Sequence, residues 1–186
     1  MSPSRRVVLD LVEREVANVN LRRHMLATEA IMQTLAPHLD GDPVEWALAG
    51  LAHDLDVERT ETDFSRHGQI AAEQLRALGV SDAVCHAVAA HNPDTGVVAR
   101  SPMDVALIAA DQLSGLITAA VLVRPDRSLA GVEVKSLRKR FKETAFARGV
   151  DRESISRCEE LGLPLPEFMG IGLQAMQRVA AELGLA

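Results

Sequence analysis

Apolar residues recur at three- and four-residue spacing along almost the whole chain. No run alternates between apolar and polar residues for the length of a strand, so the pattern predicts an all-α protein. The helices are expected near residues 4–18, 20–37, 43–55, 66–78, 82–91, 102–123, 134–147, 151–162 and 166–183.

Two of these helices have clear start signals. The segments Asp42-Pro43-Val44-Glu45 and Ser101-Pro102-Met103-Asp104 each combine a capping side chain, a proline at the first helical position and an acid three residues after the cap. Gly79 and Gly149 stand where helix C-termini are expected.

The chain of 186 residues and 20.1 kDa fits one domain over 1–186. Its most apolar stretch, 105–123, is about long enough to span a bilayer, but Asp111 interrupts it. Because a carboxylate is costly inside a membrane, a buried helix is the favoured interpretation and no membrane partner is expected. Charged residues near the start leave no apolar export signal.

Composition excludes several classes of protein. The net charge of −6 and the scarcity of aromatic residues, with four Phe, one Trp and no Tyr, argue against a partner that is a nucleic acid polymer. Cys85 and Cys158 form no CxxC pair, so neither a disulfide framework nor a thiolate zinc site is expected, and a reducing cytoplasm suits them.

Basic residues are concentrated between Arg124 and Arg152. This segment holds nine basic and four acidic residues, a charge of +5, which leaves −11 on the rest of the chain. A solvated helix face is the simpler interpretation. The alternative is a rim that receives phosphate beside a metal site.

Histidine and aspartate supply the candidate chemistry. His53 and Asp54 are adjacent at the end of an apolar helix, where both need partners. A lone pair of this kind is more often a structural hydrogen bond, but other ionisable residues point inward as well. His24 shares a helical face with Ile31, and Asp111 lies within the most apolar helix.

Four further histidines differ in their placement. His91 shares a face with Val88 and points inward, while His86 is rotated from it by roughly 140° and is expected to face solvent. His67 opens a helix, where its side chain can project past the helix end. His38, near a helix end beside Pro37, is expected at the surface.

The order of these residues resembles the HD superfamily of metal-dependent phosphohydrolases. The resemblance rests on a first His on a helix, a His-Asp pair, two further His and a distant Asp, present here as His24, His53, Asp54, His67, His91 and Asp111. Over its full length the chain is similar to a group of predicted HD hydrolases of this size.

The resemblance implies a helical HD-domain fold, with a metal-binding core at about 20–123 and a basic helical extension at 124–186. It also implies two metal ions. His24, His53, Asp54 and Asp111 would hold the first ion, and His67, His91 and Asp54 the second. Asp54 would bridge both ions and serve as the catalytic residue.

Imidazole and carboxylate ligands suit divalent transition metals, so the two ions are expected to be Mn, Fe, Co, Ni or Zn, and the ligands do not single out one of these metals. Paired ions would activate water for attack on a nucleotide or another small phosphate ester. Many relatives carry a Lys three residues after the Asp of the pair, where this chain has Val57. Substrate phosphate is therefore expected to meet Lys135, Lys142 or Arg148 of the basic segment.

Two alternatives remain open. Some HD proteins use the same ligands around two irons to oxidise a C–H bond, and others are regulatory modules without catalysis. Regulatory modules tend to lose ligands, whereas this chain has the full set, so a cytoplasmic phosphohydrolase is the favoured prediction.

Overall fold

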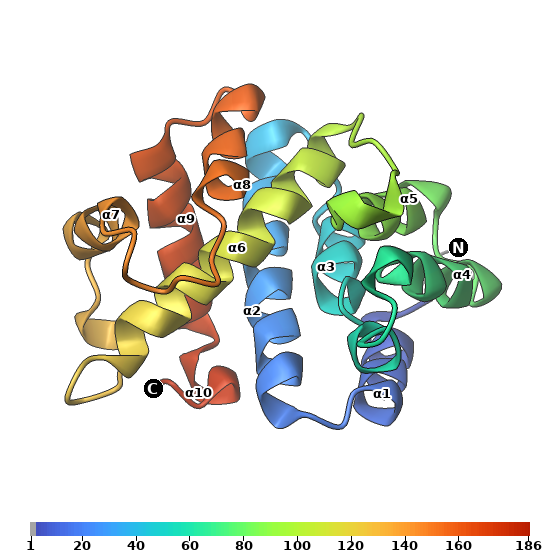
Figure 1. Cartoon of the computed structure of the whole chain (residues 1–186), viewed down its shortest axis with the longest axis horizontal. Coiled ribbons are helices and arrows are strands. Elements are labelled where there is room, and N and C mark those ends of the chain that lie inside the picture. The colour runs from blue at the N-terminus through green and yellow to red at the C-terminus, as the bar shows by residue number, and fades with distance from the viewer. Residues whose placement is uncertain (1–2) are drawn as a thin grey trace.

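The computed structural model describes residues 3–186, and that range contains α-helices and no strand (Figure 1), which confirms the all-α prediction. The α-helices are α1 (Arg5–Glu15), α2 (Val19–Leu35), α3 (Pro43–Ala52), α4 (Gln69–Ala77), α5 (Asp82–Ala90), α6 (Pro102–Leu122), α7 (Val134–Lys142), α8 (Arg152–Ser156), α9 (Leu165–Arg178) and α10 (Ala180–Leu183). Short 3-10 turns occupy Ala36–Leu39, Val57–Arg59, Phe64–Arg66, Pro93–Thr95, Leu129–Gly131 and Arg157–Leu161.

Helix α6 runs through the middle of the fold. It packs against α2, α3 and α5 on one side and against α7, α8 and α9 on the other (Figure 1). Leu107, Leu113 and Leu116 are fully buried along it. The helix is long and apolar enough to cross a membrane, yet most of it is covered by other helices, as expected for the core of a globular fold.

Helices α2 and α3 cross at very short range because of Gly50. A Cβ atom at Gly50 would lie 2.8 Å from backbone atoms of Thr28 and Glu29, closer than real Cβ contacts occur. The missing side chain lets the two backbones touch. This crossing brings the middle of α2 next to the end of α3, where His24 and His53 stand.

The predicted helix starts are confirmed. The Asp42 side chain accepts hydrogen bonds from the backbone N–H of Val44 and Glu45 at the start of α3. Ser101 forms a capping box with Asp104 at the start of α6. Both helices therefore begin where their polar caps satisfy the first free N–H groups.

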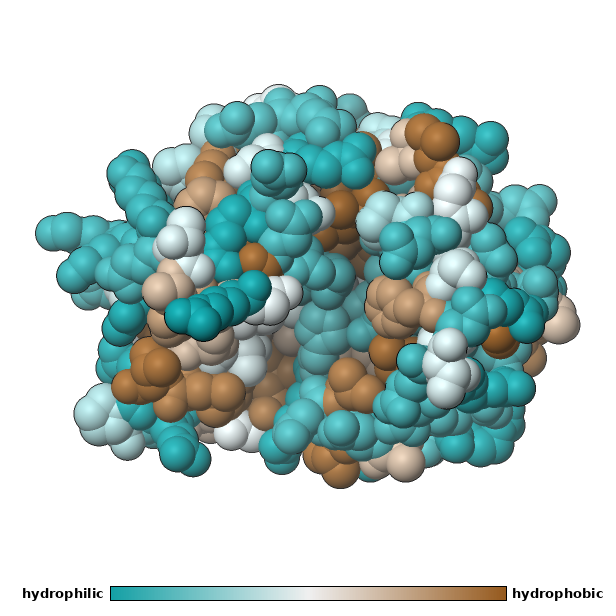
Figure 2. Space-filling view, viewed as in Figure 1, coloured by the Kyte–Doolittle hydropathy of each residue, from teal (hydrophilic) through white to brown (hydrophobic). Residues whose placement is uncertain are grey.

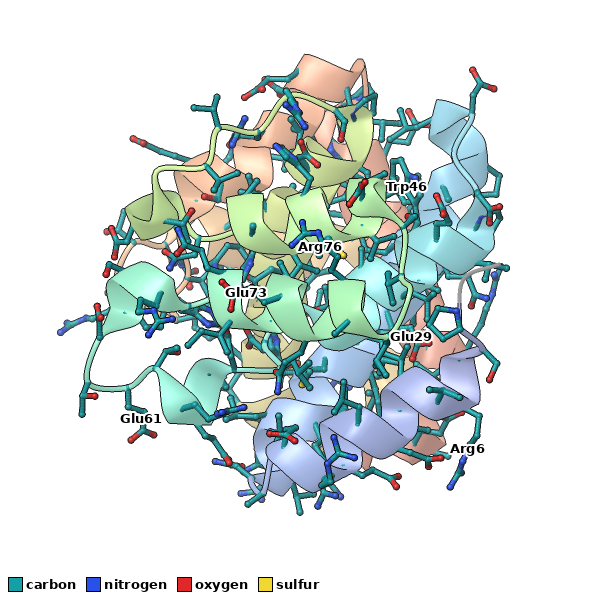
Figure 3. The ribbon with its side chains drawn as sticks, turned by 90° about the vertical axis from the view of Figure 1, so that its right-hand side faces the viewer. Arg6, Glu29, Trp46, Glu61, Glu73 and Arg76 are labelled. Atoms are coloured by element: carbon teal, nitrogen blue, oxygen red, sulfur yellow. The ribbon has the colours of Figure 1, made fainter. Side chains whose placement is uncertain are left out.

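Helix α4 covers one flank of the fold with a polar outer face (Figure 3). Its buried positions are Ala71, Ala72 and Leu75, while Glu73 and Arg76 point away from the protein. Gly79 follows the helix with φ +82°, the left-handed conformation expected for a glycine at a helix end.

The C-terminal helices differ from the prediction. Helix α7 ends at Lys142 and not near 147, because the Arg152 guanidinium binds the backbone carbonyls of Phe146, Ala147 and Val150 and stabilises a loop there. Gly149 consequently lies within that loop and ends no helix.

The last two predicted helices are interrupted. Residues 151–162 form the short helix α8 followed by a 3-10 turn. Residues 166–183 break at Val179, whose φ of −110° and ψ of 16° separate α9 from α10.

Candidate metal centre

Six side chains from separate parts of the chain converge beside α6. They form two groups, and within each group the candidate ligand atoms lie within 4.8 Å of one another. The first group is His24, His53 and Asp111, and the second is Asp54, His67 and His91. The structure thus brings together all six residues that the sequence singled out, while their role as metal ligands stays a prediction.

The first group joins helices α2, α3 and α6. His24 Nε2 lies 3.0 Å from Asp111 Oδ1 and 3.2 Å from His53 Nε2. His53 Nε2 lies 3.8 Å from the same Asp111 oxygen. Three potential ligand atoms therefore face one point.

The second group forms beside it. His67 Nε2 lies 3.1 Å from His91 Nε2 and 3.2 Å from Asp54 Oδ1, and His91 Nε2 lies 3.6 Å from that oxygen. These three side chains are largely buried.

Asp54 faces both groups. Its Oδ2 lies 3.5 Å from His24 Nε2, and its Oδ1 lies 3.4 Å from His53 Nε2 in addition to its contacts in the second group. A carboxylate in this position can offer an oxygen to each of two neighbouring ions.

Helix ends orient two of the histidines. His53 and His91 are the residues directly after α3 and α5. His53 donates its Nδ1–H to the Gly50 carbonyl at 2.9 Å, and His91 donates its Nδ1–H to the Val88 carbonyl at 2.6 Å. The last carbonyls of a helix have no N–H partner within the helix, so each is free to accept from the ring. The Nε2 lone pair of each ring is consequently directed into the cluster.

Asp56 orients His67 in the same way. The Nδ1–H of His67 donates to Asp56 Oδ1 at 2.8 Å, and this carboxylate is completely buried. The next residue, Gly68, has φ +90°, and a Cβ there would lie 2.7 Å from the Val88 carbonyl. Glycine thus allows the loop of His67 to press against the end of α5, beside His91.

Residues of α6 orient His24 and Asp111. The Ser114 hydroxyl accepts from His24 Nδ1 at 2.9 Å and donates to the Asp111 carbonyl at 2.9 Å. Gln112 Nε2 donates to Asp111 Oδ2 at 2.8 Å. This contact leaves Oδ1 of Asp111 to face His24 and His53.

The ionisation of these groups follows from their surroundings. Burial opposes the charge on His24 and His67, but the hydrogen bond of His24 to Asp111 and those of His67 to Asp54 and Asp56 raise the pKa of both histidines to about 9. Burial lowers the pKa of His53 to about 4. Despite burial, the neighbouring histidines lower the pKa of the Asp54 and Asp111 carboxyls.

The donor set fits divalent transition metals. Nitrogens of two histidine pairs face each other at 3.1 and 3.2 Å, and two carboxylates point at the same places. With Nδ1–H bonded outward, the Nε2 of a neutral ring presents a lone pair to the cluster. In the metal-free protein the raised pKa values of His24 and His67 place a proton between the paired nitrogens, and a divalent ion can take the place of that proton. A mixed nitrogen and oxygen set of this kind suits Mn, Fe, Co, Ni or Zn.

The two histidines excluded from the predicted ligand set lie outside the cluster. His38 is exposed. His86 was expected to face solvent, and that expectation is wrong, because its side chain is only 20% exposed and its Nδ1 lies 3.0 Å from Asp104 Oδ2. The start of α6 packs over α5 and covers it.

The predicted substrate-binding residues Lys135, Lys142 and Arg148 are all exposed. Helix α7, which carries the two lysines, packs against α9 and α6 on the far side of the molecule from α3, α4 and α5 (Figure 1). Arg148 belongs to the loop after α7. Gln112 holds the end of this loop, since its Oε1 accepts from the backbone N–H of Asp151 at 2.9 Å.

A cavity of about 260 Å³ opens onto the second group. Its walls are formed by Asp54, Val57, Phe64, His67, His91, Asn92, Pro93, Asp111 and Gln112. The Phe64 ring stacks on His67 with centroids 4.6 Å apart and remains 48% exposed at the mouth. Figure 2 shows that the protein is hollowed near the middle of this face.

Sequence reasoning missed the residues that orient the ligands, Asp56, Gln112, Ser114 and Asn92. Asp56 carried a signal, because it is a second acid two residues after Asp54, at the end of an apolar helix. Asn92 directly follows His91, and its side chain donates to the carbonyls of Phe64 and His67. Nothing in the local pattern distinguishes Gln112 or Ser114 from other polar helix residues.

Comparisons with known proteins agree with this geometry. The family model described as the HD domain matches residues 21–116, a segment that contains all six clustered side chains. The chain is 31% identical over 96 residues to a protein named Ribonuclease Y from Oleidesulfovibrio alaskensis (strain ATCC BAA-1058 / DSM 17464 / G20), an alignment that covers 52% of this chain and 18% of that protein. The chain therefore spans less than a fifth of this relative. No solved structure gives a significant match.

Proposed function

Because this chain belongs to the HD-domain family, whose members are generally metal-dependent phosphohydrolases, we propose that it hydrolyses a small phosphate ester such as a nucleotide. The observation that carries the proposal is the pair of His/Asp groups that share Asp54. When bound there, divalent ions would lower the pKa of water and neutralise charge on phosphoryl oxygens.

Water is the proposed nucleophile, since the carboxylates and imidazoles that line the cavity are the candidate metal ligands. Among the described residues that line the 260 Å³ cavity, none is Ser, Thr or Cys. Hydrolysis would form a P–O bond to the water oxygen and break the ester P–O bond. The water proton would finish on the released oxygen, so that the products are an alcohol and phosphate.

Asp54 has the central role in this proposal. Its low pKa keeps the carboxylate charged at neutral pH, and it faces both candidate ion positions. Its charge would hold both ions, and its remaining lone pairs could orient the attacking water.

A small ester is favoured over a nucleic acid polymer. The printed name of the relative refers to a ribonuclease, but this chain has a net charge of −6 and few aromatic residues for stacking bases. Arg148 is the best supported of the three predicted phosphate contacts, since its loop is bonded to Gln112 beside Asp111.

The direct test is hydrolysis by the purified protein loaded with Mn²⁺, assayed without oxygen on p-nitrophenyl phosphate, a set of nucleotides and a single-stranded RNA. We expect phosphate release from at least one small ester. Asp54→Asn should lower kcat/KM by several orders of magnitude, because metal activation and charge stabilisation both depend on that carboxylate. The exposed Asp10→Asn is the matched control.

Full activity in a folded, metal-poor Asp54→Asn protein would contradict the proposal. Activity that requires iron and oxygen would favour oxidation over hydrolysis. Cleavage of RNA alone would contradict the proposed substrate class.

A further inference from the structure

A second and larger cavity lies next to the metal-binding cluster. It has a volume of about 540 Å³, within the range of small-molecule sites, and His24 forms part of its wall. The other lining residues are Asn20, Arg23, Ala27, Gly115, Thr118, Ala119, Leu122, Arg127, Leu183, Gly184 and Leu185. The cavity therefore lies between α2, α6 and the C-terminus.

The walls of this cavity are mainly apolar, with two cationic groups. Ala119 and Leu122 of α6 face Leu183 and Leu185 of the C-terminal segment across it. A Cβ at Gly184 would lie 2.8 Å from the Arg23 guanidinium, so that group lies against the C-terminal wall.

Neither arginine has an acidic partner. Arg23 and Arg127 are exposed, and neither forms an ion pair with any residue from 3 to 186. Arg127 also has φ 47°, a conformation that is uncommon outside glycine and that tends to occur at functional positions. Two unpaired guanidinium groups at one apolar cavity are complementary to an anion.

The residues that close the cavity belong to the C-terminal part of the chain. Arg127 and residues 183–185 lie beyond the segment 21–116 that matches the family model. The C-terminus is fixed there, because the Leu129 N–H donates to the Leu185 carbonyl at 2.9 Å. The extension thus adds a binding wall to a shared metal-binding core.

The two cavities contact the cluster through different residues. The smaller one contacts Asp54 and Asp111, while the larger one contacts the cluster through His24. The larger cavity continues along α6 from the cluster, because Gly115 and Thr118 follow Asp111 by about one and two helical turns. A phosphoryl group at the cluster could accordingly direct its organic group into the larger cavity.

We propose that the 540 Å³ cavity binds the organic group of the phosphate ester, and that Arg23 and Arg127 bind a second anionic group on it, such as another phosphate or a carboxylate. This inference rests on the proposed function. It narrows the substrate class to esters with an apolar portion and a second negative charge.

Calorimetry with hexyl phosphate and hexane-1,6-diyl bisphosphate tests the anion site. The wild-type protein with Mn²⁺ should bind the bisphosphate at least tenfold more tightly than hexyl phosphate, because charge-assisted hydrogen bonds form at the second phosphate. In the double variant Arg23→Ala/Arg127→Ala this ratio should fall to about one. Arg138→Ala removes an exposed positive charge on α7 and should leave the ratio unchanged.

A second variant tests the apolar walls. Ala119→Phe fills part of the cavity and should weaken binding of hexyl phosphate at least tenfold relative to inorganic phosphate. Val123→Phe, at a position 57% exposed and outside the lining, should not change that relative affinity. Circular dichroism checks that each variant is folded.

Equal wild-type affinity for the two hexyl compounds, or an unchanged ratio in the folded double variant, would overturn the inference. Hydrolysis of the same compounds is measured separately. Selective binding without hydrolysis would contradict the proposed function alone, whereas hydrolysis without selectivity would contradict only the role of the cavity.

Discussion

Asp56 binds His67 on the side of the ring that faces away from the cluster, because the Nδ1–H of His67 donates to Asp56 Oδ1 at 2.8 Å. The same carboxylate also accepts the backbone N–H of Gly68 and of Ala71, so it fixes both the ring and the start of α4. Burial opposes its charge, yet these hydrogen bonds lower the pKa of Asp56. A buried carboxylate behind a ligand histidine fixes the ring nitrogen that faces the metal and makes it more basic.

Replacing this carboxylate should weaken metal binding without removing a ligand. In Asp56→Asn, the affinity of the second ion should fall by about 10- to 100-fold, the usual effect of losing an outer partner of a ligand. Titration with Mn²⁺ followed by calorimetry measures it. The exposed Asp63→Asn is the control, and equal affinity in the two variants would contradict this role.

His67 and His91 should affect the binding of the second ion alone. His67→Ala or His91→Ala should reduce the bound metal from about two ions per chain towards one, because each removes a ligand atom of the second group. His86→Ala should keep both ions and lose only the contact with Asp104. Elemental analysis of the purified proteins decides this, and metal loss in His86→Ala would refute the assignment.

The stability of the metal-free protein should fall as the pH rises, while the stabilisation by metal ions should grow. His24 and His67 have pKa values of about 9 in the metal-free protein, above the ordinary 6.5. Their contribution to the free energy of unfolding is complete below pH 6.5 and is lost as the pH rises through 9. Metal ions need neutral imidazoles, so the stabilisation that they provide grows over the same range.

Urea unfolding at pH 6.5, 8 and 9.5, with chelator or with Mn²⁺, measures both effects. As the pH rises, we expect the free energy of unfolding of the chelated protein to decrease. The difference in this free energy between the Mn²⁺ and chelator conditions should widen. A constant difference across this range would contradict the proton competition at these histidines.

Gly50 should be essential for the close crossing of α2 and α3. Gly50→Ala places a Cβ 2.8 Å from the Glu29 backbone and should reduce the free energy of unfolding by about 1–3 kcal/mol through overpacking. Gly149→Ala is the matched control, since a Cβ there meets no atom within 4 Å. It should change the free energy of unfolding by less than about 0.5 kcal/mol. Thermal unfolding that affects both variants equally would contradict this account.

Helical spacing allowed part of the candidate site to be placed from the residues alone, whereas the complete ligand set came from the resemblance to the HD superfamily. Within a helix, spacing alone decides the face of a residue, which is why His24 and Asp111 could be assigned to the interior. His86 was misplaced for the opposite reason. Its environment depends on how the start of α6 packs over α5, and helical spacing contains no information about a neighbouring helix.

The C-terminal half was harder to predict because long-range contacts determine it. Helix α7 ends early where the Arg152 guanidinium binds carbonyls of the preceding loop, a contact with no periodic signature. The cavity beside His24 likewise needs Leu183 and Leu185 to return to α2 from the far end of the chain. Basic charge between 124 and 152 predicted a phosphate contact, and only the fold shows that Arg127 lies at that cavity.

The central claim is that two ions occupy the cluster and share Asp54. Anomalous X-ray diffraction from crystals of the full chain grown with Mn²⁺ tests it most directly. The account predicts two strong peaks, one among His24, His53 and Asp111 and the other among Asp54, His67 and His91, with Asp54 oxygens next to both. Peaks confined to the protein surface, or a cluster without metal in crystals that hold Mn²⁺ elsewhere, would contradict it.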